Sequence, residues 1–214
     1  IKFKNQQPFC LAPSGHPQRN HHSKINSLIT QGFKVPLSLF VPCKNEETNL
    51  ARCLQSVSWI DEIFVVDSQS TDRTTNIADE YGAKVMQFEY KGGWPKKKNW
   101  GLENLPFSNE WVLILDADEC LPPEAEDEIK KILSDPNKKH AGYWINRRYF
   151  FLGQPLKHAY FPNWNLRLFK HKLGRYEKIT DLTTESGDHE IHEHVVVKGT
   201  TGKLKLIMDH HAFP

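Results

Sequence analysis

The sequence predicts an α/β protein built on a mostly parallel β-sheet with helices on both faces. Apolar stretches typical of strands alternate with stretches whose apolar residues recur at helical spacing. The strand-like stretches EIFVVD and WVLILD are apolar almost throughout, which is typical of strands that are buried on both faces. With 214 residues, of which 38% are hydrophobic, the chain is long enough to bury the core of one such domain.

The first elements form βαβ units. VPLSLFVP (35–42) and EIFVVD (62–67) are predicted strands, and apolar residues at helical spacing between them predict a helix over 46–57. A Ser-Thr-Asp sequence favours a helix start before residues 74–81, and a glycine after them favours its end. AKVMQF (83–88) then predicts a third strand.

The next elements repeat this alternation before the pattern changes. We expect a helix over 96–105, a fourth strand over 111–116, and a helix over 122–133 with proline in its first turn. The pieces GYWINRRYFFLG, NWNLRLFK and HEHVVVKG then follow one another without intervening helices. This half of the chain should form a mixed, partly antiparallel region.

Charge separates an N-terminal extension from the domain. The first 34 residues hold five of the 28 Lys and Arg and none of the 26 Asp and Glu. Residues 1–33, which also hold three prolines, are expected to be a loosely ordered leader or a basic arm that contacts anionic lipid headgroups. Residues 34–214 should form one domain, and we expect it to be truncated at its C-terminus. A formal net charge of only +2 argues against a nucleic-acid binder.

Cysteine usage and hydropathy bear on the compartment. The four cysteines form no CxxC pair, which favours reduced thiols. No stretch approaches the roughly 18 apolar residues of a membrane span, and no signal-peptide pattern is present. We therefore expect a cytoplasmic protein, with peripheral contact at the inner face of the plasma membrane.

Three polar or acidic clusters follow predicted parallel strands, at 44–47, 67–72 and 116–119. In an open parallel sheet the ligand binds beyond the carboxyl ends of the strands, so the clusters should converge on one crevice. Carboxylates gathered without a counterion repel one another, which favours a divalent cation that also contacts substrate phosphates. The alternative is that these residues only cap the helices that follow them.

Other phosphate-binding motifs are absent. The turn after the first strand lacks glycine, so neither the GxGxxG fingerprint of dinucleotide-binding folds nor the GxxxxGK[ST] phosphate loop is present. An Asp-x-Asp sequence also occurs in haloacid-dehalogenase-type phosphatases, where it follows the first strand of the domain. Here it follows the fourth strand.

The motifs PCKNEETNLARCL, DEIFVVDSQSTDRT and WVLILDADE, in this order, resemble family two glycosyltransferases, specifically the branch that includes lipopolysaccharide-core β-glucosyltransferases. The resemblance extends from Val35 to Phe213 and departs from the common pattern at Gln69, where glycine is usual. It implies a GT-A fold, a Rossmann-like three-layer sandwich. It further implies inverting transfer of a hexose from a nucleotide-sugar such as UDP-glucose to a cell-envelope saccharide, with Mn²⁺ or Mg²⁺ as cofactor.

The resemblance also assigns roles to individual residues. A catalytic base would accept a proton from the acceptor hydroxyl, and the segment IHEHVVV places Glu193 in that role, with Glu185, Asp188 and Glu190 as alternatives. Metal ligands would be Asp118 and His210. The nucleotide-sugar site would comprise Pro42, Asn45, Glu46, Asp67, Asp72 and Asp116. Because the leaving diphosphate gains negative charge, Lys96, Lys97 and Lys98 are candidates for stabilising it, or they belong to a solvated helix start.

Several alternatives remain open at this stage. The three histidines at 189, 192 and 194 could form a zinc site, although the spacing is not HExxH. Trp164 and Arg167 are candidates for contact with a saccharide or glycolipid acceptor, because aromatic faces suit sugars, or they belong to a packed strand. Two other functional classes are a metal-dependent nucleotidyl or phosphoryl transferase and a non-catalytic saccharide-binding relative.

Overall fold

The computed structural model of the chain describes residues 34–156, 160–178 and 194–211, and every structural statement concerns these residues. The predicted extension 1–33 and the predicted base Glu193 lie outside them. The described elements, in chain order, are β1 (Val35–Cys43), α2 (Leu50–Ser56), β2 (Ile60–Asp67), α3 (Thr74–Glu80), β3 (Lys84–Gln87), α4 (Lys97–Asn104), β4 (Trp111–Ile114), β5 (Glu119–Cys120), α5 (Ala125–Ser134), β6 (Gly142–Phe151), β7 (Gln154–Pro155), β8 (Trp164–Lys170), β9 (Gly174–Tyr176), β10 (Val195–Val197) and β11 (Thr201–His210).

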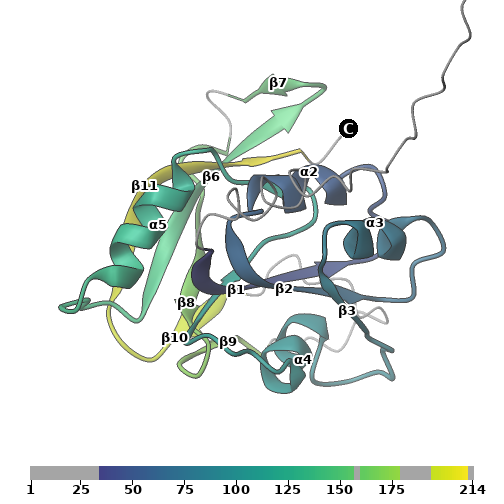
Figure 1. Cartoon of the computed structure of the whole chain (residues 1–214), viewed down its shortest axis with the longest axis horizontal. Helices are drawn as coiled ribbons and strands as arrows, with labels where there is room; N and C mark the ends of the chain where they lie inside the picture. Colours follow the sequence, from purple (N-terminus) through teal and green to yellow (C-terminus); the bar gives the residue numbers. More distant parts are fainter. Residues whose placement is uncertain (1–33, 157–159, 179–193, 212–214) are drawn as a thin grey trace, which may run out of the picture. The chain divides into compact units, whose positions relative to one another are not determined.

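One large sheet carries the fold, and its strand order is β3-β2-β1-β4-β8-β6-β11-β5 (Figure 1). The neighbours among β3, β2, β1 and β4 are all parallel. Beyond β4 the sheet becomes mixed, because β8 is antiparallel to both β4 and β6, whereas β11 runs parallel to β6. The predicted α/β fold, with a parallel half and a mixed half, is confirmed.

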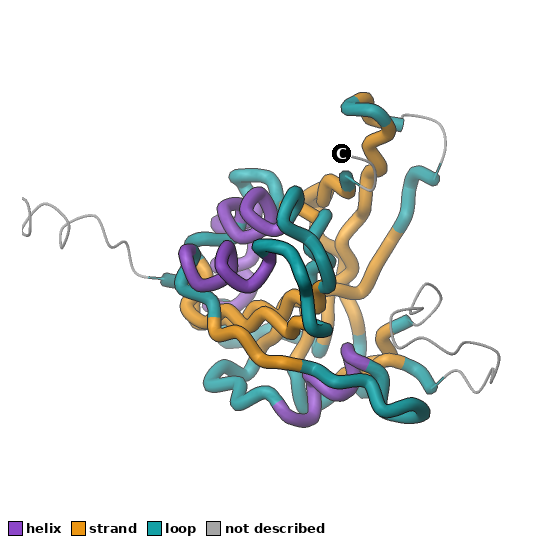
Figure 2. Tube along the Cα trace, turned by 90° about the vertical axis from the view of Figure 1, so that its right-hand side faces the viewer, coloured by secondary structure: helices purple, strands orange, loops and turns teal. Residues whose placement is uncertain are grey.

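Helices and loops cover both faces of this sheet. Apolar residues of α2, α3 and α5 pack against one face in a cluster that includes Leu37, Leu39 and Val41 of β1. The opposite face, which includes Phe40, packs against α4 residues such as Leu102. Figure 2 shows the strands between these two layers. Side chains alternate between faces along β1, so both faces of this strand need apolar residues.

Two helices begin later than their sequence patterns predict. The helix expected from residue 46 begins at Leu50, and residues 47–49 form a turn in which the Asn49 N–H donates to the carbonyl of Glu46 (3.1 Å). The helix expected from residue 122 begins at Ala125, whose N–H bonds to the carbonyl of Pro122. In both cases a turn occupies the residues that carry the start signal.

Strands β5 and β11 were missed by the sequence analysis. β11 alternates in the pattern KLKLIM, and its Leu204, Leu206 and Met208 are buried in the core. This period of two is a signal that could have identified the strand. The two-residue β5 has no such signal, because it is defined only by pairing with Asp209 and His210.

Candidate functional site

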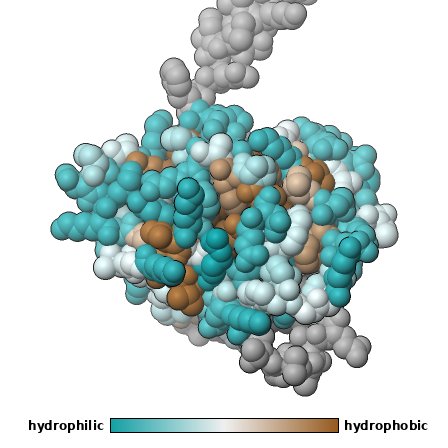
Figure 3. All heavy atoms as spheres, turned by 90° about the horizontal axis from the view of Figure 1, so that it is seen from below, coloured by the Kyte–Doolittle hydropathy of each residue, from teal (hydrophilic) through white to brown (hydrophobic). Residues whose placement is uncertain are grey.

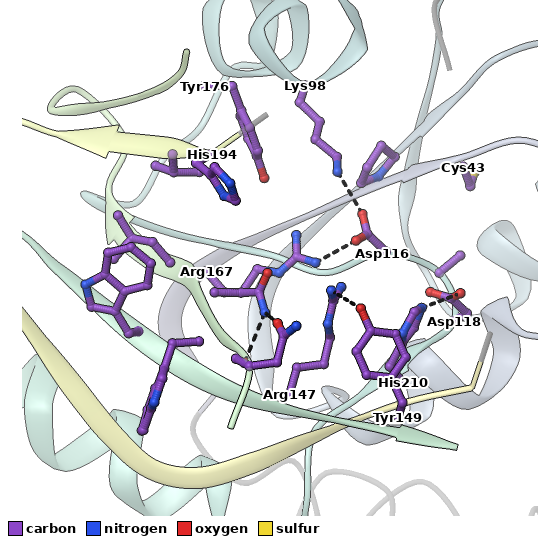
Figure 4. A pocket seen from close by; sticks show the side chains of 18 of the residues that line it. Cys43, Lys98, Asp116, Asp118, Arg147, Tyr149, Arg167, Tyr176, His194 and His210 are labelled. Carbon is purple, nitrogen blue, oxygen red and sulfur yellow. Dashed lines mark hydrogen bonds and ion pairs between the residues drawn. The ribbon is translucent and has the colours of Figure 1, made fainter. Parts of the chain in front are cut away.

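A cleft of about 910 Å³ opens at the carboxyl ends of β1 and β4, where the parallel half of the sheet meets the mixed half. Acidic, basic and aromatic side chains from most of the sheet face it (Figure 4). Its lining comprises Pro42, Cys43, Lys44, Glu46, Lys97, Lys98, Asp116, Ala117, Asp118, Trp144, Arg147, Tyr149, Pro162, Asn163, Trp164, Asn165, Leu166, Arg167, Tyr176, His194, Val195 and His210.

Asp118 and His210 meet in this cleft although 92 residues separate them. His210 Nε2 lies 2.9 Å from Asp118 Oδ2, and both side chains are about four-fifths buried or more. The pairing of β5 with β11 aligns them, because Glu119 is the register partner of His210 and the N–H of His211 donates to the carbonyl of Asp118. The ring of Tyr149 packs edge-on against His210 at a centroid distance of 4.6 Å.

Asp116 is held by two cations. Arg167 Nη2 lies 2.6 Å from Asp116 Oδ2, and Lys98 Nζ lies 3.0 Å from Oδ1. Burial alone would raise the pKa of Asp116, but these two charges and their hydrogen bonds hold it well below its usual range. Asp116 therefore stays ionised, and its carboxylate fixes both cations at the floor of the cleft.

This ion-pair cluster makes stability depend on pH in a defined direction. A carboxyl group whose pKa is lower in the folded protein stabilises the fold above its unfolded pKa of about 3.9, and loses this effect as the pH falls below that value. Thermal unfolding between pH 5 and 2.5 should therefore show a smaller loss of stability for Asp116→Asn than for the wild type. Equal pH slopes for the two proteins would contradict the ion-pair geometry.

Glu119 lies directly behind the two aspartates and was not singled out by the sequence analysis. Its side chain is fully buried and accepts hydrogen bonds from Arg167 Nη2 (2.5 Å), Arg147 Nη1 (3.1 Å) and the N–H of Asp116 (2.9 Å). Arg147 in turn donates from Nη2 to the Tyr149 hydroxyl. A buried carboxylate requires such partners, but only the fold shows which arginines supply them.

The predicted nucleotide residues divide into two groups. Pro42, Glu46 and Lys97 line the cleft, as does Asp116. Lys97 is almost fully buried and donates from Nζ to the carbonyl of Cys43 at the end of β1 (3.1 Å). Burial raises the pKa of Glu46, and the nearby charge of Asp118 adds to this shift.

Asn45, Asp67 and Asp72 do not line the cleft and instead join the loops that follow β1 and β2. Asn45 Oδ1 accepts from the N–H of Thr71 (2.8 Å), and Asp72 Oδ2 accepts from the N–H of Glu47 (3.1 Å). Asp67 is fully buried. Its carboxylate accepts from Ser70 and Gln87 side chains and from the Ser70 N–H.

Gln69, the departure from the glycine pattern, adopts a φ of 56°. This is the left-handed conformation that glycine adopts without steric cost. The turn thus keeps the backbone conformation for which glycine is usual, and the Gln69 side chain is exposed.

Both acceptor candidates, Trp164 and Arg167, line the cleft. Trp164 is half-buried, whereas Arg167 is buried beneath the floor and bonded to Asp116 and Glu119. Trp144 of β6 also lines the cleft and was missed; the period of two gives no signal for it, because Arg147 and Tyr149, which line the same cleft from β6, occupy the alternate positions. The two tryptophans line the cleft together with Asn163 and Asn165, and we call these four residues the shelf; Lys203 Nζ lies 4.4 Å from the centroid of the Trp164 ring.

The predicted base Glu193 and the histidines at 189 and 192 lie outside the described residues. His194, which follows Glu193 in the chain, lines the cleft. Its N–H donates to Glu177 Oε1 (3.1 Å), and its carbonyl accepts from the N–H of Glu177 (3.0 Å). Strands β9 and β10 thus bring the end of this segment to the site.

Asp118 and His210 are the cleft side chains to consider as ligands of a divalent metal. The described part of the chain holds no group of three or more His, Cys, Asp or Glu side chains placed to bind one ion. Asp118 and His210 offer one carboxylate oxygen and one imidazole nitrogen side by side. The carboxylate fits an ion that takes its remaining ligands from water and substrate phosphate, as Mg²⁺ and Mn²⁺ do, whereas an imidazole nitrogen is not a usual ligand of Mg²⁺.

None of the helices in the described residues has the length and apolar content needed to cross a membrane. The face seen in Figure 3 is largely hydrophilic, with hydrophobic residues gathered in small groups.

Comparison with known proteins gives one family match and several relatives. The family described as Glycosyl transferase family 2 matches residues 38–188. An uncharacterized glycosyltransferase of Rickettsia typhi is 35% identical over 151 residues, covering 69% of this chain and 51% of the relative. The lipopolysaccharide core biosynthesis glycosyltransferase LpsC of Rhizobium meliloti is 31% identical over 181 residues, covering 80% and 61%. The chain thus spans about half to three-fifths of the length of these relatives.

Solved structures show weaker similarity. Staphylococcus aureus TarS 1–349 in complex with UDP-GlcNAc is 22% identical with a TM-score of 0.49, covering 64% of this chain and 46% of that one. Glucosyl-3-phosphoglycerate synthase from Mycobacterium tuberculosis, in complex with Mn²⁺, UDP and glucosyl-3-phosphoglycerate, is 21% identical with a TM-score of 0.40, covering 64% and 51%.

Proposed function

We propose the following function on the premise that this chain belongs to glycosyl transferase family 2, whose match covers residues 38–188. The chain carries the catalytic domain of an inverting glycosyltransferase. It moves a hexose from a nucleotide-sugar, UDP-glucose, to a cell-envelope saccharide such as lipopolysaccharide core. The similarity to LpsC of Rhizobium meliloti supports this acceptor class. The protein acts in the cytoplasm, in peripheral contact with the inner face of the plasma membrane.

The observation that carries the proposal is the convergence of Asp118 and His210 with several cationic side chains in one cleft. Lys97, Lys98 and Arg167 line the same space as this pair. A nucleoside diphosphate leaves with additional negative charge on its phosphates, and fixed positive groups stabilise that charge in the transition state. A cleft in which the carboxylate of Asp118 and the imidazole of His210 lie beside several cationic side chains is suited to this type of leaving group.

Asp118 and His210 would hold a divalent cation, Mn²⁺ or Mg²⁺, and such an ion would supply positive charge for the departing diphosphate. Lys97 and Lys98 provide further positive charge from the start of α4. Asp116 keeps Lys98 and Arg167 in place through its two ion pairs.

The nucleotide lies along the wall formed by the ends of β1 and β2. Pro42 and Glu46 contact it directly from the cleft lining. Asn45, Asp67 and Asp72 shape this wall from behind, since their hydrogen bonds join the loops that follow the two strands.

The acceptor sugar lies on the shelf of Trp144 and Trp164. Glu193 accepts the proton of its hydroxyl as the oxygen attacks the anomeric carbon from the face opposite the leaving group. This direction of attack inverts the configuration. Support for Glu193 comes from its neighbour in the chain, His194, which lines the cleft.

Isothermal titration calorimetry of UDP and UDP-glucose, first with Mn²⁺ and then with EDTA, tests the proposal. We expect binding of both ligands with Mn²⁺ and a large loss of affinity in EDTA. Absence of binding under both conditions would contradict the proposal. Tighter binding of UTP than of UDP-glucose would instead favour a nucleotidyl or phosphoryl transferase.

A further inference from the structure

We propose that Glu119 is a positioning residue that holds both Asp116 and Asp118 in the geometry for sugar transfer. The inference rests on the proposed function for its catalytic consequence. Glu119 is fully buried and does not line the cleft, so it acts through its neighbours and not by contact with substrate. Its contacts lead to each aspartate by a separate route.

The route to Asp116 has two parallel contacts. Glu119 Oε2 accepts the backbone N–H of Asp116 (2.9 Å), which fixes the turn after β4. Glu119 Oε1 accepts from Arg167 Nη2 (2.5 Å), and the same nitrogen reaches Asp116 Oδ2 (2.6 Å). One guanidinium nitrogen thus joins the two carboxylates, and Glu119 sets the position from which Arg167 holds Asp116.

The route to Asp118 runs through β11 and β6, and the Glu119 carboxylate contributes to it through Arg147 of β6, because the pairing with β11 is made by the backbone. The backbone pairing of Glu119 with His210 places the imidazole beside Asp118, 2.9 Å from its Oδ2. From the other side, Glu119 Oε1 accepts from Arg147 (3.1 Å), and Arg147 donates to the hydroxyl of Tyr149. The Tyr149 ring packs against His210 at 4.6 Å and limits its rotation.

Stability alone gives no reason for so many buried charges. Buried ion pairs are costly to desolvate, and well-packed apolar replacements are often equally or more stable. Glu119, Arg147 and Arg167 all lie within one or two contacts of the cleft carboxylates. Their arrangement is the kind that keeps catalytic side chains within a narrow range of positions.

The test compares Glu119→Gln with Glu62→Gln. Glu62 is a matched control because it is also buried (6% exposed) and accepts from Ser38 Oγ (2.6 Å), the Ser108 N–H (3.0 Å) and Lys84 Nζ (3.1 Å). It lies near the beginning of β2, whereas the cleft lies at the carboxyl ends of the strands. Both variants should lower the melting temperature measured by circular dichroism.

Only Glu119→Gln should weaken binding of UDP in the presence of Mn²⁺, by roughly 10–100-fold, the range typical for loss of an outer partner of a metal site. Wild-type affinity in a folded Glu119→Gln protein would overturn the proposal. So would an equal loss in Glu62→Gln. If Glu119→Gln does not fold, Glu119→Asp keeps the charge but shortens the side chain, and its UDP affinity should still fall; wild-type affinity there would also overturn the proposal.

A second readout does not depend on nucleotide binding. In ¹⁵N NMR spectra, the side-chain N–H signals of Arg147 and Arg167 and the ring signals of His210 should shift in the Glu119 variant and not in Glu62→Gln. If the wild type bound no UDP, the proposed function would fail while this experiment still tested the network. Unshifted His210 signals would overturn the route to Asp118.

Discussion

Asp118→Asn is expected to remove most metal-dependent nucleotide binding while the fold survives. The carboxylate of Asp118 is one of the two protein groups that we assign to the metal, and it lies 2.9 Å from the other, His210. An amide keeps the size of the side chain but loses its charge and is a poorer ligand for a hard cation. The affinity for UDP with Mn²⁺, measured by calorimetry, should fall by more than the roughly 10–100-fold that loss of an outer partner costs.

Asp209→Asn is the matched control for this variant. Asp209 precedes His210 on β11 and has a similarly accessible side chain (28% against 21% exposed), but it pairs with Arg148 and does not line the cleft. It should keep wild-type UDP affinity. The assignment of Asp118 would be wrong if its asparagine variant bound UDP and Mn²⁺ as the wild type does.

The parallel half of the fold could be predicted because its signals are local. The apolar strands and the helical periodicity between them lie within stretches of about ten residues, as in EIFVVD and the helix that follows it. The position of β11, the last strand in the chain, could not be predicted from local signals, because a strand pattern does not say which strands it pairs with. β11 pairs with β6 some sixty residues earlier and with β5, and β5 exists as a strand only through that pairing.

The candidate site was predictable for residues that a motif identifies and not for those that support them. Asp116, Asp118 and His210 were found from the motifs and lie together in the cleft. Glu119 follows the same motif, yet its role depends on Arg147 and Arg167, which reach it from β6 and β8. Asp67 shows the converse. Its position at a strand end predicted contact with a ligand, but its carboxylate is fully buried and accepts hydrogen bonds from Ser70 and from Gln87 of β3.

Among the described carboxylates that line the cleft, one is a rival to Glu193 for the role of catalytic base. Three line it: Glu46, Asp116 and Asp118. The pKa of Asp116 is held well below its usual range by Arg167 and Lys98, despite its burial, so it is a weak base. Asp118 pairs with His210. Glu46 is the rival candidate, because burial raises its pKa and thereby its basicity.

Glu193→Gln should therefore lower kcat by about 10²–10⁴-fold, the usual contribution of a general base. Binding of UDP-glucose should stay unchanged, because the base contacts the acceptor hydroxyl and not the nucleotide. The measurement requires turnover of UDP-glucose with a saccharide acceptor, together with calorimetry of the donor. Glu190→Gln, three residues before it within the segment DHEIHEH, is the comparison, because Glu190 is one of the alternative bases; it should keep most of the activity if Glu193 is the base.

Glu46→Gln separates the two candidate bases. If Glu46 only lines the nucleotide wall, its variant should change donor affinity and leave the kcat with saturating donor close to that of the wild type. A variant of Glu46 that lost 10²–10⁴-fold in kcat, beside a fully active Glu193→Gln, would transfer the role of base to Glu46. Attack on the anomeric carbon would then have to come from the side of the cleft where β1 ends, and the shelf of Trp144 and Trp164 would no longer suit the acceptor.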